Sequence, residues 1–113
     1  MICPAGWHLP NDAEWAALEI AIGSSNVGSQ MKSNTGWNSG GGDNSSGFNA
    51  YPSGIVNPTD TTFSGLYSET SFWTASAHDS TTAWRRRLFT SSVGVTKGYT
   101  DKTMGLSCRC IED

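Results

Sequence analysis

The three cysteines constrain this chain more than any other feature, because they lie at its two ends. Cys3 is near the first of 113 residues, and Cys108 and Cys110 are near the last. A disulfide from Cys3 to either of the others would close a loop of about a hundred residues, worth up to about 5 kcal/mol in the chain-entropy model. The sequence therefore predicts a fold whose ends meet. Alternation along a strand does not decide which C-terminal cysteine pairs.

A zinc site is the alternative use of these cysteines. It would need Cys3, His8 and the Cys108/Cys110 pair. A C-x-C pair with one distant cysteine is not a usual zinc spacing. We therefore expect no metal and no cofactor, and a third thiol that is buried and inert.

Composition favours one domain made of short strands and polar loops. Apolar residues make up 36% of the chain and charged residues 15%, which argues against charge-driven disorder. Five tryptophans supply large units for a small core. The sequence has no apolar run of membrane-spanning length and no signal-peptide core. We expect residues 1–113 to form a single domain cut from a longer exported protein.

The charge is small but uneven. The net charge of −3 gives no reason to expect nucleic acid as a partner. Six of the seven basic residues nevertheless lie between Arg85 and Arg109, where Asp101 is the only acid. One edge of the fold is therefore expected to be locally positive, unless acids elsewhere offset it.

The clearest local signal is a helix near the N-terminus. Asn11 can cap it, and Glu14 completes a capping box three residues later. The helix is expected to end near Ile22, at Gly23. Trp15, Leu18 and Ile22 recur at helical spacing, which predicts that they face the core.

Short strands are predicted in the second half of the chain. A long loop region with one helical turn at 31–32 covers residues 24–46, and the expected strands are 48–52, 54–56, 71–75, 83–90, 93–99 and 106–111. One helix, long loops and an antiparallel sheet from the C-terminal half define an α+β fold. Within 83–90, alternation points Trp84, Arg86 and Leu88 inward, so Arg86 needs a buried partner. Arg85, Arg87 and Phe89 then face solvent, where two arginines and an aromatic ring have the chemistry of a binding surface.

Three stretches at compatible spacings resemble a known family across nearly the whole chain. They are CPAGWHLP at 3–10 followed by DAEW at 12–15, FWTA at 72–75 followed by AWRR at 83–86, and GLSCRC at 105–110. They are similar to the Fibrobacter succinogenes major paralogous domain of exported bacterial proteins. The Leu-Pro-x-x-x-Glu-Trp element also resembles the formylglycine-generating-enzyme-like branch of the C-type lectin fold, which includes the variable proteins of diversity-generating retroelements.

The resemblance implies a C-type-lectin-like fold with adjacent termini. The family's ending usually carries one cysteine, which matches Cys110 and implies a Cys3–Cys110 disulfide. Calcium-dependent sugar binding is not expected, because the lectin loop Glu-Pro-Asn or Gln-Pro-Asp, the Trp-Asn-Asp strand and clustered carboxylates are lacking.

The resemblance also marks a candidate surface. Many relatives carry asparagine at positions matching most of this surface, and retroelements randomise the adenines of such codons. Here the same positions hold mixed chemistry, as a variable face on a fixed scaffold would. The candidate ligand-binding residues are His78, Asp79, Thr82, Arg85, Arg87, Phe89, Thr90, Thr96, Tyr99, Thr100 and Asp101.

These observations favour a binding or adhesion module that is not an enzyme. It would work at the cell surface or outside the cell, as a secreted, lipoprotein or pilus-attached domain. It would bind a protein or glycan on another cell or phage without calcium, without nucleic acid and without entering the membrane, and as an isolated domain it would be a monomer. The alternatives are a structural or assembly domain of a surface protein or pilus, and a formylglycine-generating-enzyme-like oxidase using Cys108 and Cys110.

Overall fold

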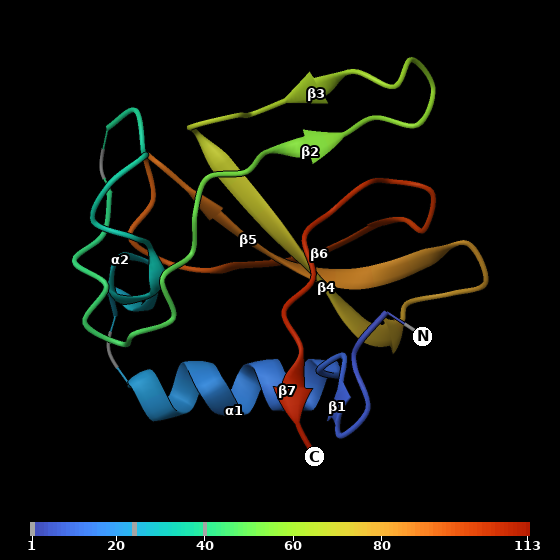
Figure 1. Cartoon of the computed structure of the whole chain (residues 1–113), viewed down its shortest axis with the longest axis horizontal. Coiled ribbons are helices and arrows are strands. Elements are labelled where there is room, and N and C mark those ends of the chain that lie inside the picture. The colour runs from blue at the N-terminus through green and yellow to red at the C-terminus, as the bar shows by residue number, and fades with distance from the viewer. Residues whose placement is uncertain (1, 24, 40) are drawn as a thin grey trace.

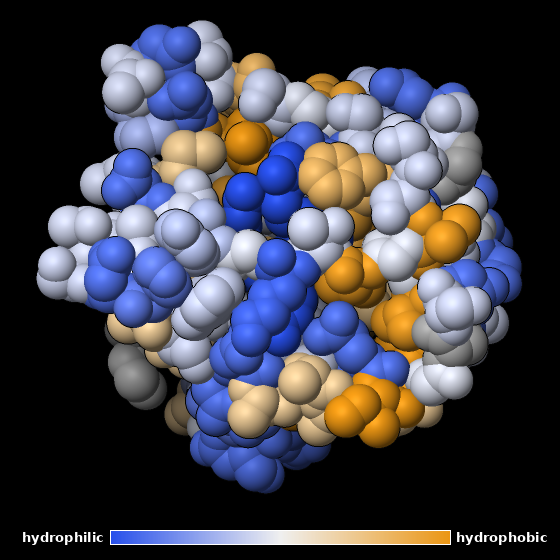
Figure 2. Space-filling model, turned by 180° about the vertical axis from the view of Figure 1, so that it is seen from behind, coloured by the Kyte–Doolittle hydropathy of each residue, from blue (hydrophilic) through white to orange (hydrophobic). Residues whose placement is uncertain are grey.

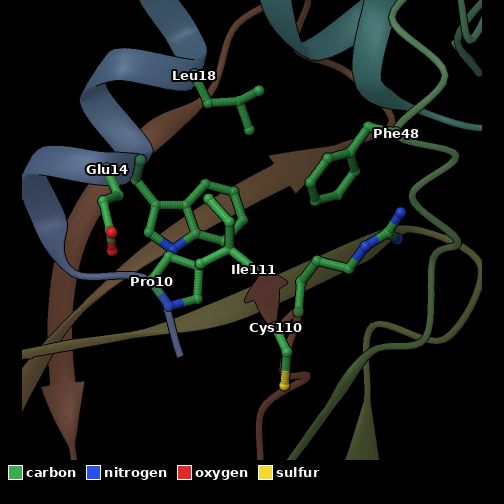
Figure 3. Close-up of a pocket in the computed structure, with 8 residues that line it drawn as sticks. Pro10, Glu14, Leu18, Phe48, Cys110 and Ile111 are labelled. Carbon is green, nitrogen blue, oxygen red and sulfur yellow. The ribbon is translucent and has the colours of Figure 1, made fainter. Parts of the chain in front are cut away.

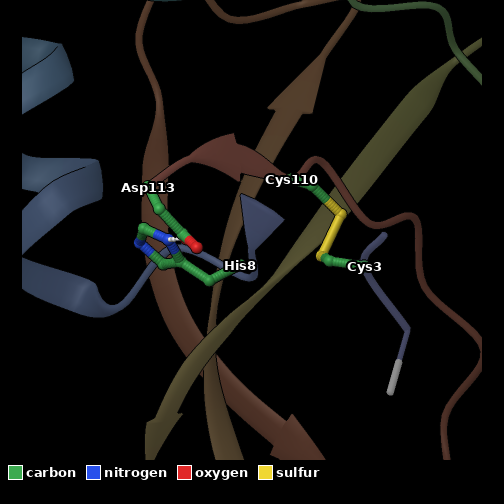
Figure 4. The surroundings of a disulfide bond; sticks show 4 residues. All are labelled: Cys3, His8, Cys110 and Asp113. Carbon is green, nitrogen blue, oxygen red and sulfur yellow. Dashed lines mark hydrogen bonds and ion pairs between the residues drawn. A yellow bond between two sulfur atoms is a disulfide. The ribbon is translucent and has the colours of Figure 1, made fainter. Parts of the chain in front are cut away.

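The two ends of the chain lie side by side in the computed structural model, which describes residues 2–23, 25–39 and 41–113 (Figure 1). The first strand, β1 (Trp7–His8), pairs antiparallel with the last, β7 (Ile111–Glu112). Beside this pair the bridge Cys3–Cys110 joins Cα atoms 5.9 Å apart (Figure 4). The expected disulfide is confirmed.

The N-terminal helix α1 (Asp12–Ile22) has the predicted ends. The Asn11 side chain accepts a hydrogen bond from the Glu14 backbone N–H, and the Glu14 carboxylate accepts one from the Asn11 N–H. Gly23 ends the helix in the left-handed conformation. Trp15 is buried, and Leu18 and Ile22 pack against the core as expected.

A three-stranded antiparallel sheet forms the centre of the molecule. Its order is β4 (Glu69–Ala77), β5 (Thr82–Phe89) and β6 (Thr96–Asp101). α1 packs on one face of it, where Trp15 lies 5.6 Å from Phe72, measured between ring centroids. We call this the helix-facing face, and the opposite one the outer face. The fold is α+β, as predicted.

The remaining elements are short. The helix α2 (Val27–Met31) lies at one end of the sheet, and the pair β2 (Ile55–Val56) and β3 (Phe63–Ser64) lies on the side away from α1 (Figure 1). No helix in the described ranges is long and apolar enough to cross a bilayer. The loop prediction at Ser24 and Gly40 falls outside the described residues.

Three strand predictions differ from the structure. Residues 48–52 contribute only a bridge at Ala50, and β7 is two residues long. The strand expected at 93–99 begins at Thr96, because the preceding turn packs on α2 and the Val93 carbonyl accepts the Ser29 N–H. A Cβ at Gly28 would lie 2.2 Å from the Gly94 carbonyl oxygen, so this close approach requires glycine.

Arg86 joins the sheet to α1. Its side chain is 2% exposed, and its guanidinium donates to Asp12 Oδ1 at 2.6 Å and to Glu19 Oε2 at 3.0 Å. The predicted partner for a buried arginine is therefore a pair of carboxylates, one at each end of α1. The second oxygen of Asp12 accepts from Lys97 on β6, so one helix residue binds two strands.

We expect Arg86→Gln to lower the free energy of unfolding by about 3 kcal/mol, since it leaves two carboxylates without their buried partner. Arg85→Gln, one residue away on the outer face, is expected to change it by no more than about 0.5 kcal/mol. Urea denaturation of both variants measures the difference. Equal losses of unfolding free energy in the two variants would contradict the structural role of Arg86.

His8 links the helix to the C-terminal strand. Its Nε2 lies 2.8 Å from Glu14 Oε1, and its Nδ1 lies 2.7 Å from Asp113 Oδ1 (Figure 4). The hydrogen bond to Glu14, followed by that to Asp113, raises the pKa of His8 above its ordinary value. The charged imidazolium of His8 thus stabilises the contact between the N-terminal and C-terminal segments.

A group whose pKa is raised by folding stabilises the protein fully below its unfolded pKa, which is about 6.5 for histidine, and loses that contribution as the pH rises through the folded value. We therefore expect the melting temperature to exceed that of the His8→Gln variant by more at pH 5.5 than at pH 8.5. Calorimetry at both pH values tests this. A difference that does not depend on pH would exclude the ion pairs as its source.

Candidate functional site

The strand register divides the predicted binding surface between the two faces of the sheet. Residues directly opposite each other share a face. Arg85 pairs with Gly98 and Arg87 with Thr96. The outer face therefore carries a set that we call the arginine strip: Arg85, Arg87, Phe89, Thr96 and Thr100.

Four side chains of the arginine strip are half-buried and Thr96 is exposed, whereas alternation along the strands predicts that all of them face solvent. The Nε–H groups of Arg85 and Arg87 are both buried without a hydrogen-bond partner in the described part of the chain. One nitrogen of Arg87 lies 3.2 Å from each carboxylate oxygen of Glu69, and its guanidinium stacks on Phe89 at 4.3 Å. Arg87 thus has a carboxylate partner, whereas the described residues give Arg85 no hydrogen bond or ion pair.

Of the two arginines, Arg85 has the charge that a bound anion would stabilise more. Burial lowers the pKa of its guanidinium, the neighbouring charge of Arg87 adds to the effect, and the carboxylate of Glu69 offsets part of it. An arginine keeps its proton at any physiological pH. The cost of holding this charge partly buried would be relieved by an anion that reaches the outer face.

A groove of about 450 Å³ continues the outer face beside Arg85. Trp73, directly opposite Arg85 on β4, forms part of its wall. Ala77 and Ala83 also line the groove, and their small side chains leave space there. Lys102 lines it as well. Trp73 and Lys102 are not among the site residues predicted from the sequence, where the tryptophans are expected to form the core. The cross-strand pairing with Arg85 was the missing information.

A second group lies on the helix-facing side of the sheet. Tyr99 is opposite Trp84, and the His78 ring stacks on Tyr99 with centroids 3.7 Å apart and planes within 5°. His78 also meets the edge of Trp84 at 4.9 Å. We call these three the aromatic cluster. Tyr99, which is 52% exposed, therefore does not belong to the arginine strip.

The other predicted residues serve the turn and strand ends around these two groups. One Asp79 oxygen accepts the backbone N–H groups of Thr81 and Thr82, and these bonds, with Thr81 first, hold the pKa of Asp79 far below its usual value. Asp101 is opposite Thr82 at the end of β6. The N–H of Thr90 donates to the Ser68 carbonyl after β5 ends.

All eleven predicted residues are exposed or half-buried, whereas three residues between them on β5 are buried. Those three are Ala83, Arg86 and Leu88. From the side opposite to Figure 1, strongly hydrophilic residues form a band through the middle of the molecule, with hydrophobic residues clustered beside it (Figure 2). The candidate positions can therefore change without altering the core.

The structure offers little for metal or thiol chemistry within the described residues. They contain no group of three potential metal-binding side chains. The Cys3–Cys110 bridge leaves a single free thiol, Cys108, which is half-buried, and burial raises its pKa. A raised pKa keeps a thiol protonated and weakly reactive.

These features define a small α+β module, closed at its ends by a disulfide and carrying a solvent-facing sheet. The chain belongs to the Fibrobacter succinogenes major domain family, whose model matches residues 1–112. No curated protein and no solved structure matches the chain significantly.

Proposed function

We propose that this domain is a calcium-independent binding module that recognises an anionic ligand on its outer face. The observation that carries the proposal is the half-buried guanidinium of Arg85, to which the described residues give no hydrogen bond or ion pair. A partly buried charge without such a partner is unfavourable, and a carboxylate, sulfate or phosphate group would pair with its outward-facing Nη groups.

The charges of the outer face support this ligand class. Arg85, Arg87 and Lys102 border the face and its groove, and Glu69 offsets one of them. Phe89 and Trp73 add aromatic surface on which a sugar ring or an apolar side chain could pack. The groove then gives the ligand a depth that a flat sheet lacks.

We also propose that the fold is of the C-type-lectin-like kind and that the domain works at a cell surface or outside the cell. The paired first and last strands support this fold, and a disulfide is typical of an oxidising compartment. The ligand would be presented by another cell or a phage.

The first test uses polygalacturonate and heparin as carboxylate and sulfate probes. We expect the domain to bind at least one of them, with an affinity that falls as salt rises, because screening weakens exposed charges. Arg85→Gln with Arg87→Gln should weaken binding by about tenfold or more, the effect of losing a charged hydrogen bond. Isothermal titration calorimetry gives both affinities.

The matched control is Lys97→Gln, compared with Arg85→Gln alone, because each of these variants removes one positive charge. Lys97 lies on the helix-facing side. This control should keep most of the affinity. Equal weakening in the two single variants would show a net-charge effect and no site.

We propose, further, that the surface is diversified by a retroelement. In support, none of the eleven candidate side chains is buried. We expect a near-copy of the DNA encoding residues 73–110 beside a reverse-transcriptase gene, differing mainly at adenines. Sequencing the genomic neighbourhood checks this. A neighbourhood without such a copy would leave a paralogous surface domain with a fixed site.

An assembly role is the second candidate. Large apolar side chains are exposed at β3 and the turn after it, with Phe63 72% and Tyr67 54% exposed. This patch lies on the β2–β3 side of the molecule, away from α1. An assembly domain would bury this patch between copies. Analytical ultracentrifugation at high concentration tests this. A domain that is monomeric there, as Phe63→Ser is expected to be, would argue against self-assembly.

A further inference from the structure

A second cavity lies between α1 and the C-terminal segment, apart from the outer face. Its volume is about 200 Å³. Leu18 extends from α1 and Phe48 from the neighbouring loop toward the same space, and Pro10 and Ile111 lie on its other side (Figure 3). Residues from the two ends of the chain and from one loop thus build a single cavity.

The wall is mainly apolar and aromatic. Trp15 is 2% exposed and lies 5.8 Å from Phe48, measured between ring centroids. Leu18, Ile111 and Pro10 complete the apolar lining. A cavity of about 150 Å³ with such a lining binds benzene in another protein, so this one has room for one ring and a short substituent.

One positive charge at this cavity is free. The Arg109 guanidinium stacks over Phe48 at 4.4 Å and forms no hydrogen bond or ion pair with any described residue. Glu14 also lines the cavity, but its two oxygens are taken by the Asn11 N–H and by His8. The charge available to a ligand is therefore that of Arg109.

The buried wall also holds an unused donor. The Trp15 indole N–H has no hydrogen-bond partner among the residues that the structure describes. A buried tryptophan N–H usually has one. The cavity thus combines an apolar, aromatic interior with a free cation, which is the pattern of a ligand site, and the buried indole N–H of Trp15 offers a signal that senses its occupancy.

We propose that this cavity binds a small aromatic carboxylate, with the ring among Trp15, Leu18 and Phe48 and the carboxylate on Arg109. The volume limits the ligand to a single ring. The planar guanidinium offers two parallel donors to a carboxylate, which sets the orientation. This site is distinct from the arginine strip and would serve a different ligand.

The test compares 3-phenylpropionate with its neutral analogue 3-phenylpropionamide on the whole 113-residue domain. Binding is followed by NMR at the indole N–H of Trp15. We expect the acid to bind about tenfold or more tightly than the amide, because only the acid makes a charged hydrogen bond. Equal affinities, or no shift of the indole signal with a large excess of the acid, would overturn the proposal.

Two variants and one control locate the site. Arg109→Gln should reduce the affinity for the acid to that for the amide, and Ile111→Trp, at a partly exposed residue, should fill the cavity and abolish binding of both. Lys97→Gln, which removes a positive charge that does not line the cavity, should leave both affinities unchanged. An acid affinity that survives Arg109→Gln would refute the assigned carboxylate contact. Because the indole signal of Trp15 reports on this cavity, failure here is separate from failure of polygalacturonate or heparin binding.

Discussion

The joining of the two chain ends is the constraint on which the rest of the structure depends. The Cys3–Cys110 bridge and the β1–β7 pairing fix the start of α1 against the end of the chain. His8 strengthens this junction through carboxylates on both sides. Once α1 is fixed, two of its acids, Asp12 and Glu19, can hold Arg86 under the sheet, which sets the orientation of β5.

The orientation of β5 decides which surfaces the protein can use. Because Arg86 and Leu88 face the helix, Arg85 and Arg87 must lie on the outer face. Among the described residues their Nε–H groups have no acceptor, in contrast to the guanidinium of Arg86, which two carboxylates hold. The same residue type thus stabilises the fold on one face and, on the other, forms the surface that we propose as a binding site.

The junction of the ends also creates the second cavity. Arg109 and Ile111 reach the wall of α1 only because β7 returns to β1. The disulfide residue Cys110 lies in the cavity wall. The joined ends therefore give both a rigid frame and a cavity near the C-terminal segment, apart from the sheet surface.

The sequence alone determined the helix with its caps, the α+β class, the inward direction of Arg86 and the meeting of the chain ends. Capping and strand alternation act over short distances along the chain, and a disulfide joins the ends through one covalent bond. Only the tertiary structure decided that Tyr99 and Arg85 lie on opposite faces, that Trp73 lies beside Arg85, and that Arg109 faces Phe48. Cross-strand register and the packing of distant segments place these side chains, and neither leaves a local pattern in the sequence.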